Sequence, residues 1–599
     1  MSSVDEVVID PFDWRRVADA GSGLLATFNA ADVLGSSDVH AARRLGALAG
    51  ASVSDEVLLA IALAVRAPRF GHVFADLSSV VATVTVEPES GVDVAALPWP
   101  EAEPWIAAVA ACPLVAVGED TDNGAFPLRL AGSALYLDRY WRQERALASD
   151  LRRLASGAPV VDDGVLGAGL GRLFTDDVQR RAGEVAVRQR LSVIAGGPGT
   201  GKTTTVARVA ALLLEQGASL IALAAPTGKA AARMEEAVHA EAASLDVSAE
   251  TRERLLGLSS STLHRLLGWR PDSRSRFRHG RENRLPHDVV IVDETSMVSL
   301  SMMESLVSAI RPGSRLVLVG DPGQLTSVEA GAVLGDIVAS SALAQGVVTL
   351  ERVYRHGGGI AQLASAISQG DDDEVIDLLL AGMDDVVWLD IDAAVASADE
   401  LEEVREVAVA SARGVVSSAA AGEAADALRA LEGFRLLCAH RRGPHGATTW
   451  MRTLEHWLAE GVPGFDPGAE WYVGRPLLVT ENDYGLKLFN GDTGVVIAVG
   501  DDRVEAAFER SGEPVTFSPT RLGAVDTVYA MTIHKSQGSQ FGTVAVVLPD
   551  AGSAMLTREL LYTAVTRARE RVVLVGDEDA VRAAVRRSTG RASALSALL

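Results

Sequence analysis

The sequence is nearly without lysine. Its 599 residues contain four lysines, Lys202, Lys229, Lys487 and Lys535, although lysine and arginine together number 55. Arginine therefore supplies almost every cation, and the compact ammonium of lysine is kept for a few positions. We expect these to be positions where the broad, planar guanidinium of arginine does not fit.

Cysteine and long apolar runs are also scarce. Cys112 and Cys438 lie far apart, which excludes a disulfide framework or a cysteine-based metal site and predicts two buried thiols in a reducing compartment. The longest apolar stretch, 105–118, is too short to span a bilayer and contains Pro113. The acidic N-terminal segment has no signal-peptide pattern, so we expect a cytoplasmic protein.

Basic residues are outnumbered, and the net charge is -24 at pH 7. This net charge excludes a protein whose whole surface binds nucleic acid, but it is compatible with a local basic channel. One candidate runs from Arg270 to Arg284, where six arginines face two acids and lie close to Trp269 and Phe277. Such a segment suits contact with a nucleic-acid backbone and base stacking, with a solvated charged loop as the alternative.

Changes of pattern along the chain divide it into four parts. Residues 1–115 predict a mainly helical N-terminal docking domain, including a helix that starts after Ser54 and stops at Pro68. Residues 116–171 predict a hairpin, a helix and a linker rich in Gly and Asp. Two α/β domains follow, at 172–345 and 346–599, the second with a β insertion at about 470–525.

Continuous apolar strands separated by helices predict the fold of the two large domains. "LSVIAG", "SLIALAAPT", "DVVIVDE" and "SRLVLVGDP" each end in polar residues. This pattern is typical of a doubly wound parallel sheet, whose ligands bind at the carboxyl ends of the strands. The strand-rich block with the turn "NGDTG" predicts a small β-barrel inserted in the second domain.

"GGPGTGKT", Gly196 to Thr203, lies between a predicted strand and a predicted helix. In that context, G-x-x-x-x-G-K-[ST] indicates a phosphate loop, whose backbone N–H groups cradle phosphate oxygens at a helix N-terminus. Lys202 would reach the β- and γ-phosphates, and Thr203 would offer its hydroxyl to Mg²⁺. We therefore expect ATP with Mg²⁺ at this loop.

Three further positions extend this site. Asp293 and Glu294 end the strand of "VIVDETSMV"; Asp293 suits Mg²⁺, and Glu294 is placed to orient and deprotonate the attacking water. Gln324, in the turn after the next strand, could reach the γ-phosphate. A turn glutamine without function is the alternative.

The second domain offers paired arginines. Arg352 and Arg355 lie in "LERVYRHGGGI", and Arg567 and Arg569 in "YTAVTRARERVVLVG". An arginine that crosses from a second domain can stabilise the charge of the transferred phosphoryl group, which makes domain closure depend on the nucleotide. Each one alone could equally be a surface arginine.

The order of motifs "GGPGTGKT", "APTGKAAARM", "STLHRLLGW", "VIVDETSMV", "LVLVGDPGQL", "LERVYRH", "TIHKSQGSQF" and "LLYTAVTRAR" resembles superfamily 1 helicases. The motif "HKSQGS", preceded by "GRPLLVTENDYGLKLFNGDTGVV", resembles the RecD family in particular. The resemblance as a whole covers about 172–599. "LYLDRYWRQE" extends the likeness more weakly toward the N-terminus. The resemblance implies two RecA-like P-loop domains, the second with an SH3-like β-barrel insertion, and 5′→3′ movement on one DNA strand.

The resemblance also implies roles for individual residues. The catalytic set is Lys202, Glu294, Gln324, Arg355 and Arg567, and the metal ligands are Thr203 and Asp293. The implied nucleotide contacts are Gln179, at the adenine, together with Gly196, Gly197, Pro198, Gly199, Thr200, Gly201, Lys202, Thr203, Thr204 and Gly538. The implied contacts to DNA are Thr227, Lys229, His264, Lys487, Asn490, Thr532, His534 and Lys535.

One residue departs from the family pattern. Related helicases usually have an acidic residue where "SQF" has Gln540, which keeps an acceptor but loses the charge. The selectivity for base and sugar is therefore less determined than the phosphate chemistry.

The resemblance implies a subunit that works with RecB-like and RecC-like partners on single-stranded and duplex-end DNA in double-strand break repair. No cluster of acids typical of a nuclease occurs, so nuclease activity is expected in a partner. A stand-alone RecD-like helicase is the close alternative, but the short segment before the P-loop domain favours docking to partners. A structural subunit with a vestigial ATPase and a small-molecule P-loop kinase are the remaining alternatives.

Overall fold

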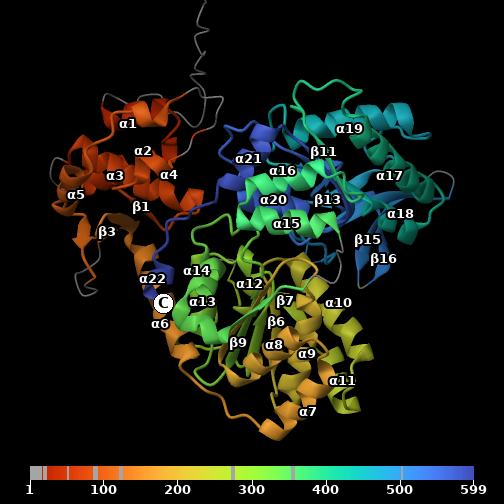
Figure 1. Cartoon of the computed structure of the whole chain (residues 1–599), viewed down its shortest axis with the longest axis horizontal. Helices are drawn as coiled ribbons and strands as arrows, with labels where there is room; N and C mark the ends of the chain where they lie inside the picture. Colours follow the sequence, from red (N-terminus) through yellow and green to blue (C-terminus); the bar gives the residue numbers. More distant parts are fainter. Residues whose placement is uncertain are drawn as a thin grey trace, which may run out of the picture.

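The computed structural model describes residues 17, 23–49, 53–84, 86, 92–119, 126–270, 277–352, 358–483, 485–500, 503–510 and 512–599. Figure 1 shows three bodies: an N-terminal region in red and orange, a first α/β domain in gold and green, and a second α/β domain in teal and blue. None of the helices formed by the described residues combines the length and apolar character that crossing a bilayer requires.

The N-terminal region combines helices with a small mixed sheet in the order β1-β4-β3-β2. As predicted, the third helix starts after Ser54, whose hydroxyl accepts a hydrogen bond from Val57 N, and it ends just before Pro68. The sequence predicted only the hairpin of this sheet. The helices are α1 (Leu24–Ala30), α2 (Ser36–Leu48), α3 (Asp55–Arg66), η1 (Ala67–Phe70), α4 (Val80–Thr83), η3 (Val94–Ala96) and α5 (Ala102–Ala110), and the strands are β1 (Phe74–Asp76), β2 (Val115–Val117), β3 (Leu128–Ala131) and β4 (Ala134–Leu137).

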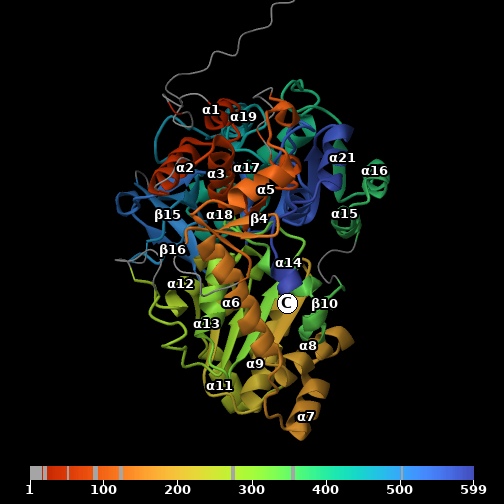
Figure 2. The same cartoon turned by 90° about the vertical axis from the view of Figure 1, so that its left-hand side faces the viewer.

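Helix α6 (Asp138–Ala155) carries the chain from this region along the first α/β domain, as Figure 2 shows. The predicted linker at 156–171 is largely a helix, α7 (Asp163–Leu173). Its glycines argued against helix, but the Asp162 carboxylate caps the first turn by accepting from Val165 N. Leu166 and Leu173 then bury their side chains in the core, and this packing outweighs the low helix propensity of glycine.

The first α/β domain contains a six-stranded parallel sheet in the order β10-β5-β9-β8-β6-β7. The predicted apolar strands are buried on both faces, as expected of a doubly wound sheet. Helices α6, α13 and α14 cover one face, and α7 to α11 cover the other. The strands are β5 (Leu191–Gly196), β6 (Ile221–Ala225), β7 (Ser260–Thr262), β8 (Val289–Val292), β9 (Arg315–Gly320) and β10 (Val347–Leu350), and the helices are α8 (Asp177–Arg188), α9 (Lys202–Glu215), α10 (Gly228–Ser244), α11 (Ala249–Leu256), α12 (Leu263–Leu266), η4 (Thr295–Met297), α13 (Leu300–Ala309), α14 (Val333–Ala339) and η5 (Ser341–Gly346).

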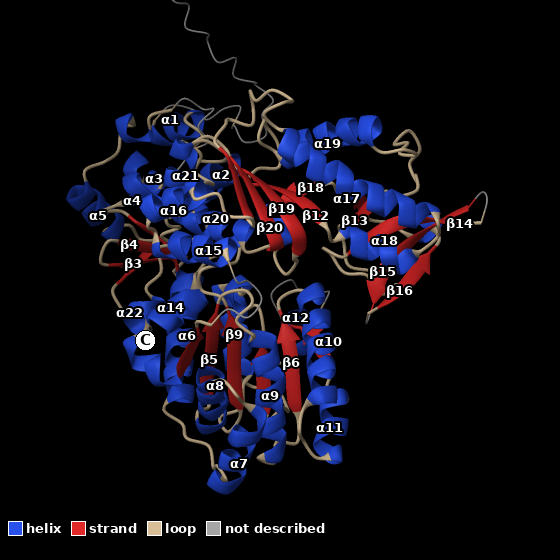
Figure 3. Ribbon diagram, turned by 45° about the vertical axis from the view of Figure 1, so that its right-hand side comes forward, coloured by secondary structure: helices blue, strands red, loops and turns tan. Residues whose placement is uncertain are grey.

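The second α/β domain contains a five-stranded parallel sheet in the order β11-β20-β19-β12-β18, which fans out above the first sheet in Figure 3. Helices α15, α16, α20 and α21 pack on one face, and α17 and α19 on the other. The strands are β11 (Val386–Leu389), β12 (Phe434–Cys438), β18 (Ala530–Thr532), β19 (Phe541–Val547) and β20 (Ala568–Val575), and the helices are α15 (Gly359–Gln369), α16 (Asp372–Leu380), α17 (Glu402–Ala420), α18 (Ala424–Leu431), α19 (Ala447–Gly461), η7 (Ile533–Ser536), α20 (Arg558–Val565) and α21 (Glu578–Arg586).

The β insertion lies in the chain between α19 and β18, where the sequence predicted a strand-rich block. It forms an antiparallel sheet in the order β16-β15-β14-β13-β17, with β16 and β17 at its edges. Helix α18 packs on β14. The elements are β13 (Pro476–Val479), β14 (Thr493–Val499), β15 (Arg503–Arg510), β16 (Glu513–Phe517), η6 (Pro519–Arg521) and β17 (Val525–Thr527).

After α21 the chain returns to the N-terminal region and the first α/β domain, where α22 (Leu595–Leu598) lies near α6 (Figure 1). Val73 N donates to Ala592 O at 2.7 Å, and Ala592 N donates to His72 Nδ1 at 3.0 Å. The side chain of Leu595 is fully buried in the core of the first α/β domain. This segment, 587–599, therefore ties the second domain to the other two bodies.

Candidate active site

The segment Gly196–Thr203 connects β5 to α9 as a tight loop. Gly199 and Gly201 have φ values of 78° and 81°, a left-handed conformation that glycine adopts without strain. Lys202 Nζ donates to two carbonyls of the same loop, to Gly196 O at 2.6 Å and to Gly197 O at 2.8 Å. The predicted phosphate loop thus holds its lysine at the concave side, where backbone N–H groups and the helix N-terminus favour an anion.

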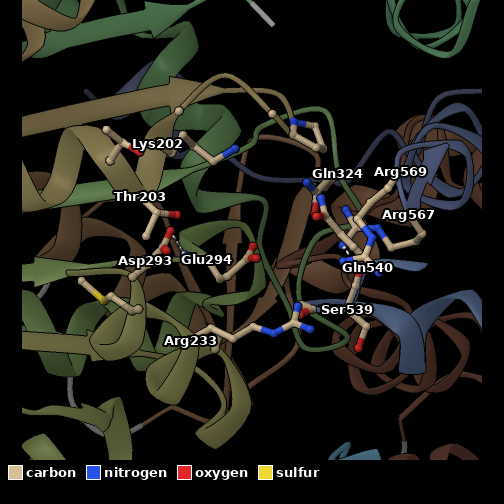
Figure 4. Close-up of a pocket in the computed structure, with 18 of the residues that line it drawn as sticks. Lys202, Thr203, Arg233, Asp293, Glu294, Gln324, Ser539, Gln540, Arg567 and Arg569 are labelled. Atoms are coloured by element: carbon tan, nitrogen blue, oxygen red, sulfur yellow. Dashed lines mark hydrogen bonds between the residues drawn. The ribbon is translucent and has the colours of Figure 1, made fainter. Parts of the chain in front are cut away.

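Two carboxylates follow β8 directly. Asp293 Oδ1 accepts a hydrogen bond from Glu294 N at 2.7 Å, and Glu294 has a left-handed backbone with φ of 50°. Enclosure by protein, together with the charge of Glu294, raises the pKa of Asp293 to about 6, while Lys202 opposes the rise. Because of this strained turn, the two carboxylates point in different directions although both follow the same strand: Asp293 lies beside Thr203, and Glu294 points toward the middle of the pocket (Figure 4).

Both α/β domains line one cavity of ≈ 370 Å³, shown in Figure 4. From the first domain come the phosphate loop, the two carboxylates, Gln324 and one face of α10. From the second come the loop before β19 and residues near the amino ends of β12 and β20. The lining residues are Pro198, Gly199, Gly201, Lys202, Thr203, Thr204, Ala230, Arg233, Met234, Ala237, Asp293, Glu294, Gln324, Glu432, Gly538, Ser539, Gln540, Arg567 and Arg569.

Arg567 reaches the cavity from the end of α20 and is 3% exposed. Its Nε donates to Thr563 O at 3.0 Å and its Nη1 to Ser539 O at 3.2 Å, so the guanidinium is held in place. Burial lowers the pKa of Arg567, and the charges of Glu294 and Asp321 oppose that shift. The structure therefore presents a fixed cation across the cavity from Lys202.

The structure adds cavity residues that the sequence did not single out. Arg233 lines the cavity from α10 and donates to Gly538 O across the domain boundary. Glu432 pairs with Arg569 at 2.9 Å. Arg233 could have been found, because it follows Lys229 by four residues in "APTGKAAARM" and shares its helix face; Glu432 offers no such pattern.

The two predicted glutamines occupy different places. Gln324 lies in the cavity, and its Nε2 donates to Asp321 Oδ2 at 2.9 Å, an atom that also accepts from Tyr562 Oη of the second domain at 3.2 Å. Gln179 is buried at the start of α8, where its Oε1 accepts from Arg208 at 3.4 Å, and it is not one of the lining residues. Arg355 lies outside the described residues.

The predicted DNA contacts fall in three places. Thr227 caps α10, with its Oγ1 accepting from Ala230 N at 3.2 Å, and Lys229 beside it donates to two protein acceptors, Gly491 O and Ser539 Oγ. Lys487, in a left-handed conformation with φ of 54°, and Asn490 are exposed on the turn before β14.

The third place is the side of the molecule near the N-terminal region. Thr532 ends β18, and His534 and the exposed Lys535 lie on η7. His534 lines a second cleft of ≈ 950 Å³ between the N-terminal region and the two domains, together with Arg69, Arg587 and Arg591. Burial lowers the pKa of both His534 and His264.

The basic segment before β8 is partly committed to structural contacts. Arg281 pairs with Asp150 of α6 at 2.7 Å, and Arg284 donates to Ser308 O at 3.1 Å. Trp269 keeps 44% exposure, and its backbone bridges to Phe277. Residues 271–276 lie outside the described residues. These contacts leave fewer free arginines in this segment than its composition suggests.

Three family profiles match separate parts of the chain. Residues 30–136 match the family profile described as RecBCD enzyme subunit RecD, N-terminal domain. Residues 175–384 match an AAA domain, and residues 527–575 match a UvrD-like helicase C-terminal domain.

Two relatives match nearly the whole chain, and a third matches about three quarters of it. The RecBCD enzyme subunit RecD of Mycolicibacterium smegmatis is 50% identical over 576 residues, which is 94% of this chain and 97% of that protein. The RecBCD enzyme subunit RecD of Mycobacterium tuberculosis is 49% identical over 587 residues, 96% of each chain. The ATP-dependent RecD2 DNA helicase of Deinococcus radiodurans is 32% identical over 474 residues, 77% of this chain and 58% of that protein. By identity and coverage, the chain belongs to the family of the RecBCD enzyme subunit RecD.

Proposed function

We propose that this protein is an ATP-driven DNA helicase subunit of a RecBCD-type enzyme acting in double-strand break repair and recombination. The observation that carries the proposal is the shared cavity, because a phosphate loop and two carboxylates of one domain face a fixed arginine, Arg567, of the other. A cavity divided in this way makes nucleotide turnover depend on the approach of two domains.

The residues present fit Mg²⁺ with ATP. Thr203 and Asp293 line the same cavity as Lys202 and offer the hard oxygen ligands that Mg²⁺ prefers. Burial and the charge of Glu294 raise the pKa of Asp293, and a cation bound there would favour its charged form. When bound, Mg²⁺ neutralises charge on the β- and γ-phosphate oxygens.

The chain's own groups would perform the remaining work. Lys202 would leave its loop carbonyls to meet the phosphates, while Glu294 orients and deprotonates the attacking water. Arg567 stabilises charge on the transferred group, with Arg355 as the second proposed finger. Gln324, held by Asp321, reports the presence of the γ-phosphate. Gln179 is assigned to the adenine by the family resemblance alone, since it does not line the cavity.

DNA contacts are proposed for the exposed turn with Lys487 and Asn490, for Thr532, His534 and Lys535 at the end of β18 and on η7, and for His264 of α12. Thr227 is assigned to the same path. The ≈ 950 Å³ cleft lined by His534 and three arginines supports a strand passing between the N-terminal region and the α/β domains. By resemblance, movement along the strand is 5′→3′.

The same proposal extends to the N-terminal region, the insertion and the setting in which the enzyme acts. Residues 1–115 form a docking domain for RecB-like and RecC-like subunits, and the insertion at about 470–525 is an SH3-like barrel. The enzyme acts on duplex ends in the cytoplasm. Two RecD subunits are 50% and 49% identical to this chain, against 32% for the RecD2 helicase, which favours the subunit over the stand-alone alternative.

The test is Lys202→Gln. ATP turnover with single-stranded DNA should fall at least about 100-fold, because a charge-stabilising group aimed at the phosphates is lost. The control, Arg429→Gln, removes an exposed cation of α18 and should leave turnover unchanged. An assembled complex whose ATP turnover and unwinding rate are unchanged by Lys202→Gln would indicate the structural alternative.

A further inference from the structure

Three segments that are distant in the sequence meet around the ammonium of Lys229. They are the first turn of α10, the turn 489–492 before β14, and the loop 538–540 before β19. Lys229 Nζ donates to Gly491 O at 3.1 Å and to Ser539 Oγ at 2.8 Å. One side chain of the first α/β domain thus bonds to the insertion and to the second domain at once.

The turn packs tightly on α10 beside this lysine. A Cβ atom at Gly228 would lie 2.5 Å from Phe489 Cγ, so only glycine permits this approach. The turn is also tied internally, because Asp492 Oδ2 accepts from Phe489 N at 2.7 Å and Phe489 O accepts from Asp492 N at 2.9 Å. A shift of Gly491 would therefore move the turn as one unit.

A lysine at this junction is energetically unfavourable, because its charged ammonium is taken out of water. Lys229 is half-buried as a residue, but protein encloses its ammonium, and this enclosure lowers its pKa to about 7. The charges of Arg233 and Arg435 lower the pKa further, while Asp492 and Glu432 oppose them. An apolar side chain of similar length would avoid the cost of desolvating a charge. The presence of a lysine at this position is therefore better explained by the segments that it connects than by a contribution to the stability of the fold.

What it connects includes the nucleotide cavity. Gly538 and Ser539 line that cavity, and so does Arg233, one turn further along α10. Arg233 donates to Gly538 O while Lys229 donates to Ser539 Oγ. The loop 538–540 is thus held by two cations on one face of α10, and Lys229 continues the link to the insertion.

We propose that Lys229 is a positioning residue that couples the nucleotide cavity to the insertion turn, with its ammonium bonded to protein and not to DNA. Nucleotide that draws the loop 538–540 toward the phosphates shifts Ser539, and Lys229 transmits the shift to Gly491. The turn carries Asn490 and follows Lys487, both proposed to face DNA, and in this respect the inference rests on the proposed function.

The first experiment uses nucleotide alone and the full chain. Amide hydrogen exchange is followed in wild type, in Lys229→Met and in the matched control Arg429→Met, with and without a non-hydrolysable ATP analogue and Mg²⁺. In wild type and control, nucleotide should slow exchange in the turn by about fivefold or more, the lower end of coupling between sites. In Lys229→Met, protection should persist at the phosphate loop and disappear at the turn. If nucleotide protected the turn equally in wild type and in Lys229→Met, the inference would be overturned.

A second variant keeps the test valid if Lys229→Met does not fold. Ser539→Ala removes one acceptor and no charge, and it should weaken the same protection; full protection in that variant would also count against the inference. Gly228→Ala pushes on Phe489 without changing any donor, and it should uncouple the turn in the same way.

The final experiment separates this inference from the proposed function. The affinity of the chain for a fluorescent ATP analogue is measured without DNA and with a saturating concentration of an oligo-dT strand. Wild type should bind the nucleotide at least about fivefold more tightly with DNA, and Lys229→Met should lose this difference. A wild type without any DNA effect contradicts the helicase function, while the exchange result stands. Weakened DNA binding by nucleotide-free Lys229→Met, with turn protection intact, would identify Lys229 as a DNA contact and overturn the inference.

Discussion

Asp293 and Glu294 are adjacent residues, but the turn after β8 gives them separate tasks. Glu294→Gln keeps the size and removes the proposed base. We expect ATP turnover to fall by about 10²–10⁴-fold, the usual contribution of a positioned base, with nucleotide affinity largely kept. The measurement is single-turnover hydrolysis beside equilibrium binding. Glu250→Gln, on the exposed side of α11, is the control, and a variant that loses affinity and turnover equally would contradict this role.

Lys229 should give the protein a recognisable dependence of stability on pH. Its pKa is about 7 in the folded state, below the ~10.4 of an unfolded lysine. Between these values the unfolded chain binds more protons, so the free energy of unfolding rises with pH, by at most about 1.4 kcal/mol per unit. Partial exposure of the residue reduces that slope.

The measurement is the apparent Tm of wild type and Lys229→Met from pH 6 to pH 10. Below about pH 7 the difference between the two should be constant, because folded and unfolded lysine are both protonated. Above it, wild type should gain relative to the variant. Parallel curves over the whole range would show that the ammonium is not enclosed in solution.

Among the four lysines, sequence and structure agree in part. The motif containing Lys202 predicted its place on the phosphate loop, where it lies. Lys487 and Lys535 are exposed, so the argument that arginine would not fit does not apply to their surroundings. Lys229 is the position where space and charge are most restricted. Its two acceptors lie 262 and 310 residues away along the chain, which no local pattern could have indicated.

At the scale of elements, the four-residue helix α22 anchors the end of the chain in the core of the first α/β domain. Leu595→Ala should destabilise the protein by about 2–5 kcal/mol, because it leaves a cavity in the core of the first α/β domain. Ser596→Ala, on the exposed side of the same helix, is the matched control. The measurement is thermal unfolding of the purified chain, and equal Tm values for the two variants would show that the 587–599 segment is not firmly docked.

Elements with a strong periodic pattern were predicted well, and those fixed by packing were not. The apolar runs of β5, β6, β8 and β9 indicated their strands directly, and Ser54 marked the start of α3. The segment of helix α7 was predicted as a linker because its glycines have low helix propensity. Packing in the core of the first α/β domain stabilises the helix nonetheless. The strands β1 and β2 are three residues long, too short to show a period.

At the scale of the whole molecule, the net charge of -24 limits how this chain can hold DNA alone. Few phosphates can be neutralised, so we expect weak binding of single-stranded DNA by the isolated chain. Co-expression with RecB-like and RecC-like subunits should yield a complex that co-elutes in size-exclusion chromatography and unwinds duplex ends faster than the chain alone. A stable monomer with full unwinding activity would contradict the subunit function.

The sequence by itself determined the doubly wound sheets, the phosphate loop, the pair of carboxylates and the family resemblance, because each depends on residues close together in the chain. Only the tertiary structure decided which second-domain groups face that loop. Glu432 and Arg567 reach the cavity because the carboxyl ends of β8 and β9 face the amino ends of β12 and β20, and Arg233 joins them from α10 of the first domain. The role of Lys229 depends in the same way on a contact among three separate segments, and local periodicity carries no information about which distant segments meet.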